Sequence, residues 1–168
     1  SADLEKVSGD RQSLEVLSNA REPLSLRLTD NAGDPLAGET VVFTVDQGGG
    51  KVGVGSDTMS SYAMGHTDEG GFVRARYRAD TTAGLSVVQA RVPNRNIEAT
   101  YRLRVKPGRL AELVPVSGDR QSTLYGRSVP EPLVVEARDR HGNPVSNVGL
   151  KVTDASGKGM IDLSTDTR

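Results

Sequence analysis

The sequence predicts an all-β protein, an antiparallel β-sandwich, and three observations lead to this fold class. Apolar and polar residues alternate with a period of two over most of residues 22–106. The 168 residues include 19 glycines and 8 prolines but no tryptophan, which is typical of short strands joined by many turns. No segment shows the periodicity of a helix. Strands with one apolar face indicate two sheets packed on a shared core.

About seven strands are expected in the first 107 residues. They cover residues 14–17, 22–29, 40–46, 62–66, 72–78, 86–92 and 100–106. Their apolar positions are expected to face the core: Leu24, Leu26, Leu28, Val41, Phe43, Val45, Val73, Ala75, Tyr77, Val88, Ala90, Val92, Tyr101, Leu103 and Val105. Turn signals separate the strands at residues 31–35, 48–50, 69–71 and 93–94.

An internal repeat organises the chain. Residues 8–13, Ser-Gly-Asp-Arg-Gln-Ser, return as residues 117–122, an offset of 109. The same offset carries residues 22–24 onto 131–133, and the turn at 30–36 onto 139–145, without a gap. Agreement in register over about fifty residues indicates a tandem repeat.

The second copy is expected to be incomplete. It ends at Arg168, which aligns with Met59, so the counterparts of residues 60–107 are missing. We therefore expect a complete domain over 1–107 and the N-terminal half of a second domain over 108–168. Half a sandwich exposes strand edges and buries little apolar surface, so it is either cut or completed by another chain or segment. The short linker at 106–109, Lys-Pro-Gly-Arg, should stack the units end to end.

Several spaced motifs of the first copy carry a family resemblance. They are Asp30-x-x-Gly33-Asp34-Pro35-Leu36-x-Gly38-x-x-Val41-x-Phe43-x-Val45, then Gly48-Gly49-Gly50, Thr67-Asp68-x-x-Gly71-x-Val73 and Ala83-Gly84-x-x-x-Val88-x-Ala90. Residues 3–107 and the first half of the second copy resemble bacterial immunoglobulin-like domains of the intimin/invasin type (group 1). The resemblance implies an immunoglobulin-like fold and tandem sandwiches that hold a binding tip away from the bacterial membrane. Fold alone does not decide function.

Charge and composition argue against several function classes. Lys and Arg number 21 and Asp and Glu 22, so we expect no nucleic-acid binding through bulk positive charge. The chain has no cysteine and no apolar run long enough for a membrane span. Its two histidines, His66 and His141, fall in different copies, and no Gly-x-Ser-x-Gly elbow or zinc motif occurs. We therefore expect no enzyme and no catalytic residues.

Acidic residues gather in turns, where Asp usually bonds its own backbone. Calcium is the one cofactor to weigh, because it prefers several loop oxygens. The repeated Asp10 and Asp119 are the candidate ligands, although Arg11 or Arg120 follows each and could pair with it. No Asp-x-Asp-x-Asp-Gly loop occurs, so we expect no cofactor or metal and keep calcium as the alternative.

Two strands carry outward arginines: Arg74, Arg76 and Arg78 on the strand at 72–78, and Arg102 and Arg104 on the strand at 100–106. These five are the candidate ligand-binding residues, because guanidinium groups bind anionic glycans and phosphates. A solvated face that prevents edge-to-edge aggregation is the simpler interpretation. Platforms for sugar stacking are few, since only Tyr62 and Tyr125 are expected outside the core.

Residues and resemblance together predict a non-enzymatic spacer of a bacterial adhesin-like protein that is at the cell surface, outer membrane-associated or secreted. Its expected partners are neighbouring immunoglobulin-like domains of the same protein. One alternative is a module that binds a surface glycan or host receptor through the arginine faces. Another is an assembly module whose half-domain is completed by another copy of the chain. An accessory domain of a secreted hydrolase is the last alternative.

Overall fold

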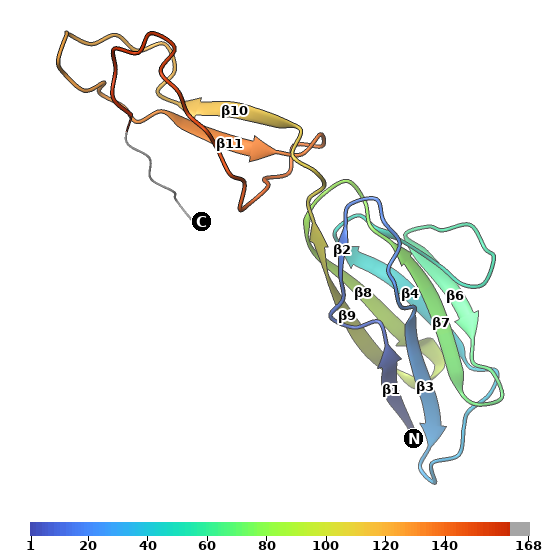
Figure 1. Cartoon of the computed structure of the whole chain (residues 1–168). Coiled ribbons are helices and arrows are strands. Elements are labelled where there is room, and N and C mark those ends of the chain that lie inside the picture. The colour runs from blue at the N-terminus through green and yellow to red at the C-terminus, as the bar shows by residue number, and fades with distance from the viewer. Residues whose placement is uncertain (162–168) are drawn as a thin grey trace.

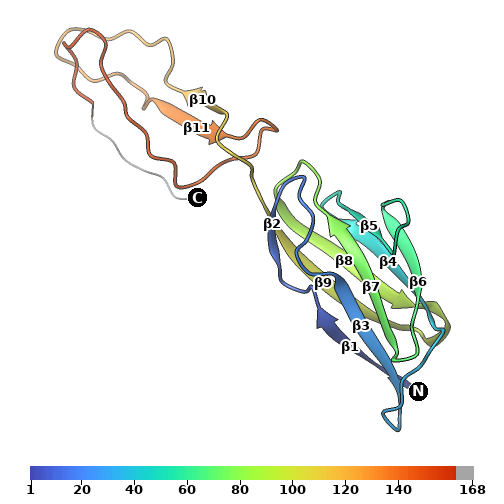
Figure 2. The same cartoon turned by 45° about the vertical axis from the view of Figure 1, so that its right-hand side comes forward.

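The structure, a computed structural model, describes residues 1–161. These residues form eleven β-strands and one 3-10 turn, η1 (Pro93–Arg95), and contain no α-helix. Strands β1 to β9 build an N-terminal unit, and β10 and β11 build a C-terminal unit (Figure 1). The two units lie end to end, and the molecule is elongated in both views (Figure 1, Figure 2). The predicted all-β sandwich is confirmed.

Two sheets face each other in the N-terminal unit. One contains β1 (Ala2–Ser8), β3 (Leu24–Asp30), β7 (Phe72–Arg78) and β5 (Lys51–Gly53), in that order. The other contains β2 (Ser13–Glu15), β9 (Ile97–Lys106), β8 (Gly84–Val92), β4 (Thr40–Gln47) and β6 (Tyr62–His66), in that order. One pairing departs from the antiparallel expectation, because β2 runs parallel to β9.

The strands agree with the prediction where apolar alternation is strong. Strands β6 and β7 have the expected bounds, and β3, β4, β8 and β9 differ from theirs by a few residues. Alternation did not reveal β1 or β5. Strand β1 is an edge strand in which charged residues interrupt the apolar alternation, and β5 has only three residues.

The core consists of the alternating residues of both sheets. Every apolar position expected to face inward is buried except Val45, which is half-buried beside an irregularity in the pairing of β4 with β8. Two tyrosines lie in this core, and each hydroxyl has a partner. The Tyr101 hydroxyl donates to the Ser25 carbonyl at 2.7 Å, and the Tyr77 hydroxyl lies 2.5 Å from Ser86 Oγ. Both tyrosine rings are therefore buried with their hydroxyl groups hydrogen-bonded, and this requirement favours one packing of the two sheets.

The Ser-Gly-Asp-Arg-Gln-Ser motif is where the chain crosses from one sheet to the other. Strand β1 pairs with β3 before the motif, and β2 pairs with β9 after it. Gly9 has φ +93°, and a Cβ there would lie 2.4 Å from the Pro23 carbonyl oxygen. The Gln12 side chain donates to the carbonyls of Gly9 and Glu22, both at 2.9 Å, and accepts from the Glu22 N–H at 3.0 Å. The motif therefore stabilises a tight crossing.

The second copy of the motif repeats this geometry in the C-terminal unit. Gly118 has φ +81°, and the Gln121 side chain donates to the carbonyls of Gly118 and Glu131, both at 2.7 Å. It also accepts from the Glu131 N–H at 2.8 Å. Equal residues at an offset of 109 thus make equal hydrogen bonds.

The C-terminal unit has strands but no closed core. Strand β10 (Glu112–Ser117) pairs antiparallel with β11 (Val134–Arg138), and no hydrophobic residue after Val105 is buried among the described residues. Leu133 is 66% exposed, whereas its counterpart Leu24 is fully buried. The covering strands of the first unit have no counterpart in this part of the chain. Residues 162–168, the end of the expected half-domain, lie outside the described residues.

Candidate functional site at the joint between the two units

The joint is built around the turn at residues 139–145, which follows β11. The Asp139 Oδ1 atom accepts the N–H groups of His141 at 2.8 Å and Asn143 at 2.9 Å. The Asp139 N–H donates to the Asn143 carbonyl at 2.9 Å, and Gly142 adopts φ +85°. An aspartate that bonds backbone two and four residues ahead, with a glycine in the left-handed region, makes a rigid turn. The Asn143 side chain is thereby aimed at the N-terminal unit.

Asn143 connects this turn to the loop between β7 and β8. Its Nδ2 donates to the Thr81 carbonyl at 2.7 Å, and its Oδ1 accepts the Ala83 N–H at 2.9 Å. Both polar atoms of one carboxamide are thus used across the joint. A side chain that donates to one backbone group and accepts from another recognises a single register of the facing loop.

Asp139 adds the linker to the same network. Its Oδ2 accepts the Gly108 N–H at 2.9 Å and the Asn143 Nδ2 at 2.9 Å. Gly108 is also close to both units, because a Cβ there would lie 3.6 Å from Val16 and 3.7 Å from the Asp139 carboxylate. The linker, the loop and the turn therefore form one hydrogen-bonded joint.

The joint buries its two polar side chains. Asp139 is 1% exposed and Asn143 8% exposed. Burial opposes ionisation of Asp139, but hydrogen bonds from the Asn143 side chain and three backbone N–H groups outweigh it and hold the pKa of this carboxyl below its usual range. A buried carboxylate with several donors is satisfied only while they stay in place, so opening the joint is costly.

The candidate arginines do not form one surface. Arg74, Arg76 and Arg78 lie on β7 in one sheet, whereas Arg102 and Arg104 lie on β9 in the other. The two groups therefore point outward from opposite faces of the sandwich.

The β7 group has local partners. The Arg74 guanidinium lies 5.6 Å from the centre of the Phe72 ring and 3.9 Å from Asp68. Arg76 donates to the Asp57 carbonyl at 2.7 Å. Ligand binding by the arginines stays a prediction.

The two calcium candidates have different surroundings. Asp10 accepts from Lys6 Nζ at 2.6 Å and from the Arg102 N–H at 2.9 Å. Among residues 1–161, the ion pair of Asp10 is formed with Lys6, whereas the arginine considered from the sequence was the adjacent Arg11. Asp119 is exposed and lies 3.9 Å from Arg120. Within residues 1–161, no three His, Cys, Asp or Glu side chains come together as a metal site.

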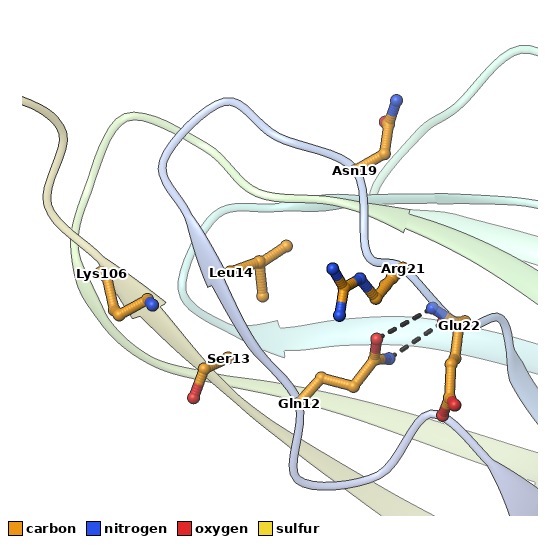
Figure 3. A pocket seen from close by; sticks show the side chains of 7 residues that line it. All are labelled: Gln12, Ser13, Leu14, Asn19, Arg21, Glu22 and Lys106. Carbon is orange, nitrogen blue, oxygen red and sulfur yellow. Dashed lines mark hydrogen bonds between the residues drawn. The ribbon is translucent and has the colours of Figure 1, made fainter.

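The strand ends near the crossing enclose a shallow hollow. Its lining residues are Gln12, Ser13, Leu14, Asn19, Arg21, Glu22 and Lys106 (Figure 3). The Gln12 side chain points to the Glu22 backbone, and the two dashed hydrogen bonds are those of the crossing (Figure 3). His66 and His141, which are far apart in the chain, take no part in it: His66 lies 3.2 Å from Thr40 Oγ1, and His141 belongs to the joint turn. The hollow is therefore part of the crossing.

The sequence did not predict that Asn143, Thr81 and Ala83 would form a contact between the two units. The repeated turn was visible, and so was the change from Asp34 in the first copy to Asn143 in the second. That change was the available signal, because it exchanges a side chain that only accepts for one that also donates.

The fold and the joint define a class of protein: a β-sandwich unit docked end to end on a second β unit. No protein-family model and no curated protein matches the sequence. Among solved structures, the chain is similar to invasin, a bacterial integrin-binding protein, over 88% of this chain and 28% of that one, with 21% identity and a TM-score of 0.45. It is also similar to domains 4–9 of the surface layer protein SbsC, over 92% and 23% of the two chains, with 16% identity and a TM-score of 0.44.

The chain spans about a quarter of the length of these structures, 28% and 23%. In the described part of the chain, no helix has the length and hydropathy needed to cross a bilayer.

Proposed function

We propose that this chain is a non-enzymatic spacer segment of a bacterial surface or secreted adhesin-like protein, and that its joint holds successive units at a fixed angle. One observation carries the proposal: the Asn143 carboxamide bonds the Thr81 carbonyl and the Ala83 N–H across the joint. The bacterial location rests on the resemblance of the sequence motifs.

The mechanism is mechanical. The N-terminal unit is a sandwich with a continuous core, so it transmits force without changing shape. The linker is short, and Pro107 restricts its backbone. Motion between domains is the default when few contacts join them. Here, hydrogen bonds from the turn to both the loop and the linker oppose that motion.

The experiment compares the angular spread of the joint in three chains. Because the chain has no cysteine, single cysteines at the exposed positions Thr44 and Glu112 can carry spin labels on the two units. We expect a narrow distance distribution in the parent chain and a broad one in Asn143→Ala. Asn94→Ala, a change at an exposed asparagine far from the joint, should leave it narrow. A parent distribution as broad as that of Asn143→Ala would identify a flexible tether.

A second candidate function is assembly, and one observation favours it. Leu133 and Val135 are 66% and 45% exposed, while their counterparts Leu24 and Leu26 are fully buried beneath strands of the opposite sheet. The C-terminal unit thus exposes residues that a completed sandwich covers, as in strand addition from another chain.

Light-scattering mass combined with limited proteolysis distinguishes assembly from a passive spacer. A dimer or higher species that resists cleavage in residues 108–161 supports completion by another chain. A monomer that is trimmed back to the linker removes assembly and leaves the spacer.

A further inference from the structure

The N-terminal unit carries, at its other end, a turn with the geometry of the joint turn. Asp30 Oδ1 accepts the N–H groups of Ala32 and Asp34, both at 2.9 Å, and the Asp30 N–H donates to the Asp34 carbonyl at 2.8 Å. Gly33 has φ +86°, against +85° for Gly142. The turn follows β3 and lies near the N-terminus, at the end of the unit away from the joint (Figure 1, Figure 2). The chain therefore has two copies of one turn geometry, and the copy at 139–145 makes contacts across the joint.

The turn at 30–34 is exposed to solvent where the matching turn at 139–143 is buried in the joint. Asp34 is exposed and Asp30 half-buried, whereas Asn143 and Asp139 are buried. Asp139 Oδ2 accepts the Gly108 N–H and the Asn143 amide. The Asp30 Oδ2 atom accepts no hydrogen bond from any described residue. Its acceptor capacity is free at the position that the linker fills in the joint.

One chemical difference separates the two turns. Asn143 donates to the Thr81 carbonyl, but Asp34 at the matching position has a carboxylate, which only accepts. A loop of the Thr81–Ala83 kind would place its carbonyl against two carboxylates, Asp30 and Asp34. The Ala83 N–H of that loop could donate to one carboxylate oxygen, but no donor would lie between the carbonyl and the two carboxylates, and burying that arrangement is unfavourable. The open turn therefore rejects the kind of loop that the joint turn accepts.

We propose that the Asp30–Asp34 turn is a second end-to-end docking surface, and that its partner is a neighbouring β-sandwich unit with a hydrogen-bond donor where Thr81 presents its carbonyl. That donor is the ammonium of Lys, the guanidinium of Arg or an N–H group. This inference rests on the proposed function, because it extends the same joint to the other end of the unit. The residue at this turn position, Asp34 in one turn and Asn143 in the other, then determines which neighbouring unit docks there. It attracts a loop with the complementary hydrogen-bonding group and repels a loop without it.

The partner is not a free second copy of this chain. The Thr81–Ala83 loop of such a copy is occupied by its own Asn143, and beside the Ala83 N–H it offers the Thr81 carbonyl, an acceptor for which Asp34 has no donor. A unit that ends in a cationic side chain meets both requirements: it neutralises the carboxylate pair and satisfies its free acceptors.

The test lengthens the chain by one unit. Residues 1–109 are fused directly ahead of Ser1, which preserves the offset of 109 between units and brings a Thr81–Ala83 loop to the Asp30–Asp34 turn. Three fusions are compared: the parent, Asp34→Asn in the second unit, and Thr81→Lys in the added unit. Spin labels on the added and second units report the new joint, and a second label pair reports the Asn143 joint in the same fusions.

We expect the parent fusion to give a broad distance distribution at the new joint. Asp34→Asn should narrow it at least about twofold, because the loop then meets an asparagine. Thr81→Lys keeps the backbone carbonyl but adds an ammonium group beside it, so this variant should also narrow the distribution, and high salt should reverse only that effect. Circular dichroism melts verify that each fusion is folded.

Two results would overturn the inference. A parent fusion as narrow as Asp34→Asn would show that Asp34 does not select the partner. Distributions that stay broad in all three fusions, beside a narrow Asn143 joint, would show that the turn does not dock, with the proposed spacer function intact. A broad Asn143 joint would instead reject the spacer function and this inference together.

Discussion

The Asn143 side chain donates to the Asp139 carboxylate at 2.9 Å and to the Thr81 carbonyl, 62 residues earlier in the chain, at 2.7 Å. Asp139 therefore orients the carboxamide that reaches the other unit. The pair acts as a unit: removing the carboxylate frees the amide to rotate, and removing the amide leaves a buried carboxylate with one donor fewer.

Replacing Asp139 should open the joint. Asp139→Ala removes the acceptor of the Gly108 N–H and the Asn143 amide, and a loss of about 1.5 kcal/mol corresponds to roughly tenfold more open joint. Trypsin cleavage after the exposed Arg109 measures this opening. Asp119→Ala, at an exposed aspartate of the same unit, is the matched control. Equal cleavage rates for the two variants would contradict the role given to Asp139.

The joint should resist mild acid and open in strong acid. The pKa of Asp139 in the joint lies below 3.8, the ordinary value that applies when the chain is unfolded or the joint open. A lowered pKa means that the closed state binds fewer protons than the open state, so its stabilisation is complete above the ordinary value and is lost as pH falls below it.

Spin-label distances across the joint, measured as a function of pH, check this sign. The distribution should be constant from neutral pH to about pH 5 and broaden below about pH 3. Asp139→Asn, which cannot ionise, should remove the broadening step. Broadening that starts near neutral pH would assign the transition to another group.

Phe43 should be essential to the N-terminal unit. It is fully buried, and its ring lies 6.4 Å from the Tyr101 ring. Phe43→Ala should lower the free energy of unfolding by about 3–5 kcal/mol, measured by urea titration. Tyr62→Ala, at a side chain 61% exposed, should change it by less than about 0.5 kcal/mol. A loss under about 1 kcal/mol for Phe43→Ala would contradict this packing.

Gly9 and Gly33 should tolerate alanine differently, although their φ angles, +93° and +86°, are similar. A Cβ at Gly33 meets nothing within 4 Å, so Gly33→Ala should cost only the backbone strain of about 1–2 kcal/mol. A Cβ at Gly9 would lie 2.4 Å from the Pro23 carbonyl oxygen. Gly9→Ala should therefore lower the thermal midpoint further than Gly33→Ala, and equal midpoints would exclude the close approach.

The two arginine groups should behave independently. Because β7 and β9 belong to different sheets, we expect a short sulfated glycan to bind one group without the other. If the β7 face binds the glycan, changing Arg74, Arg76 and Arg78 to Ser should abolish the salt-sensitive binding. The comparison is the variant with Arg102→Ser and Arg104→Ser, which should then still bind. Binding that survives both sets of changes would exclude the arginine faces as the ligand site.

The sequence by itself determined the fold class and most of the core. Alternation along β7 placed Val73, Ala75 and Tyr77 inside, and the structure agrees, because the side-chain direction in a strand depends only on residue parity. The repeated motifs also predicted matching turns, and Gly33 and Gly142 do share a positive φ. These properties depend on residues close together in the chain.

Only the tertiary structure decided how the strands and units meet. The parallel pairing of β2 with β9, the separation of the two arginine groups and the contact of Asn143 with Thr81 all join segments far apart in the sequence. Alternation says that a residue faces a core, but not which sheet holds the strand or which loop lies opposite a turn. Asn143 has its role because the end-to-end arrangement of the two units brings the loop after β7 to the turn after β11.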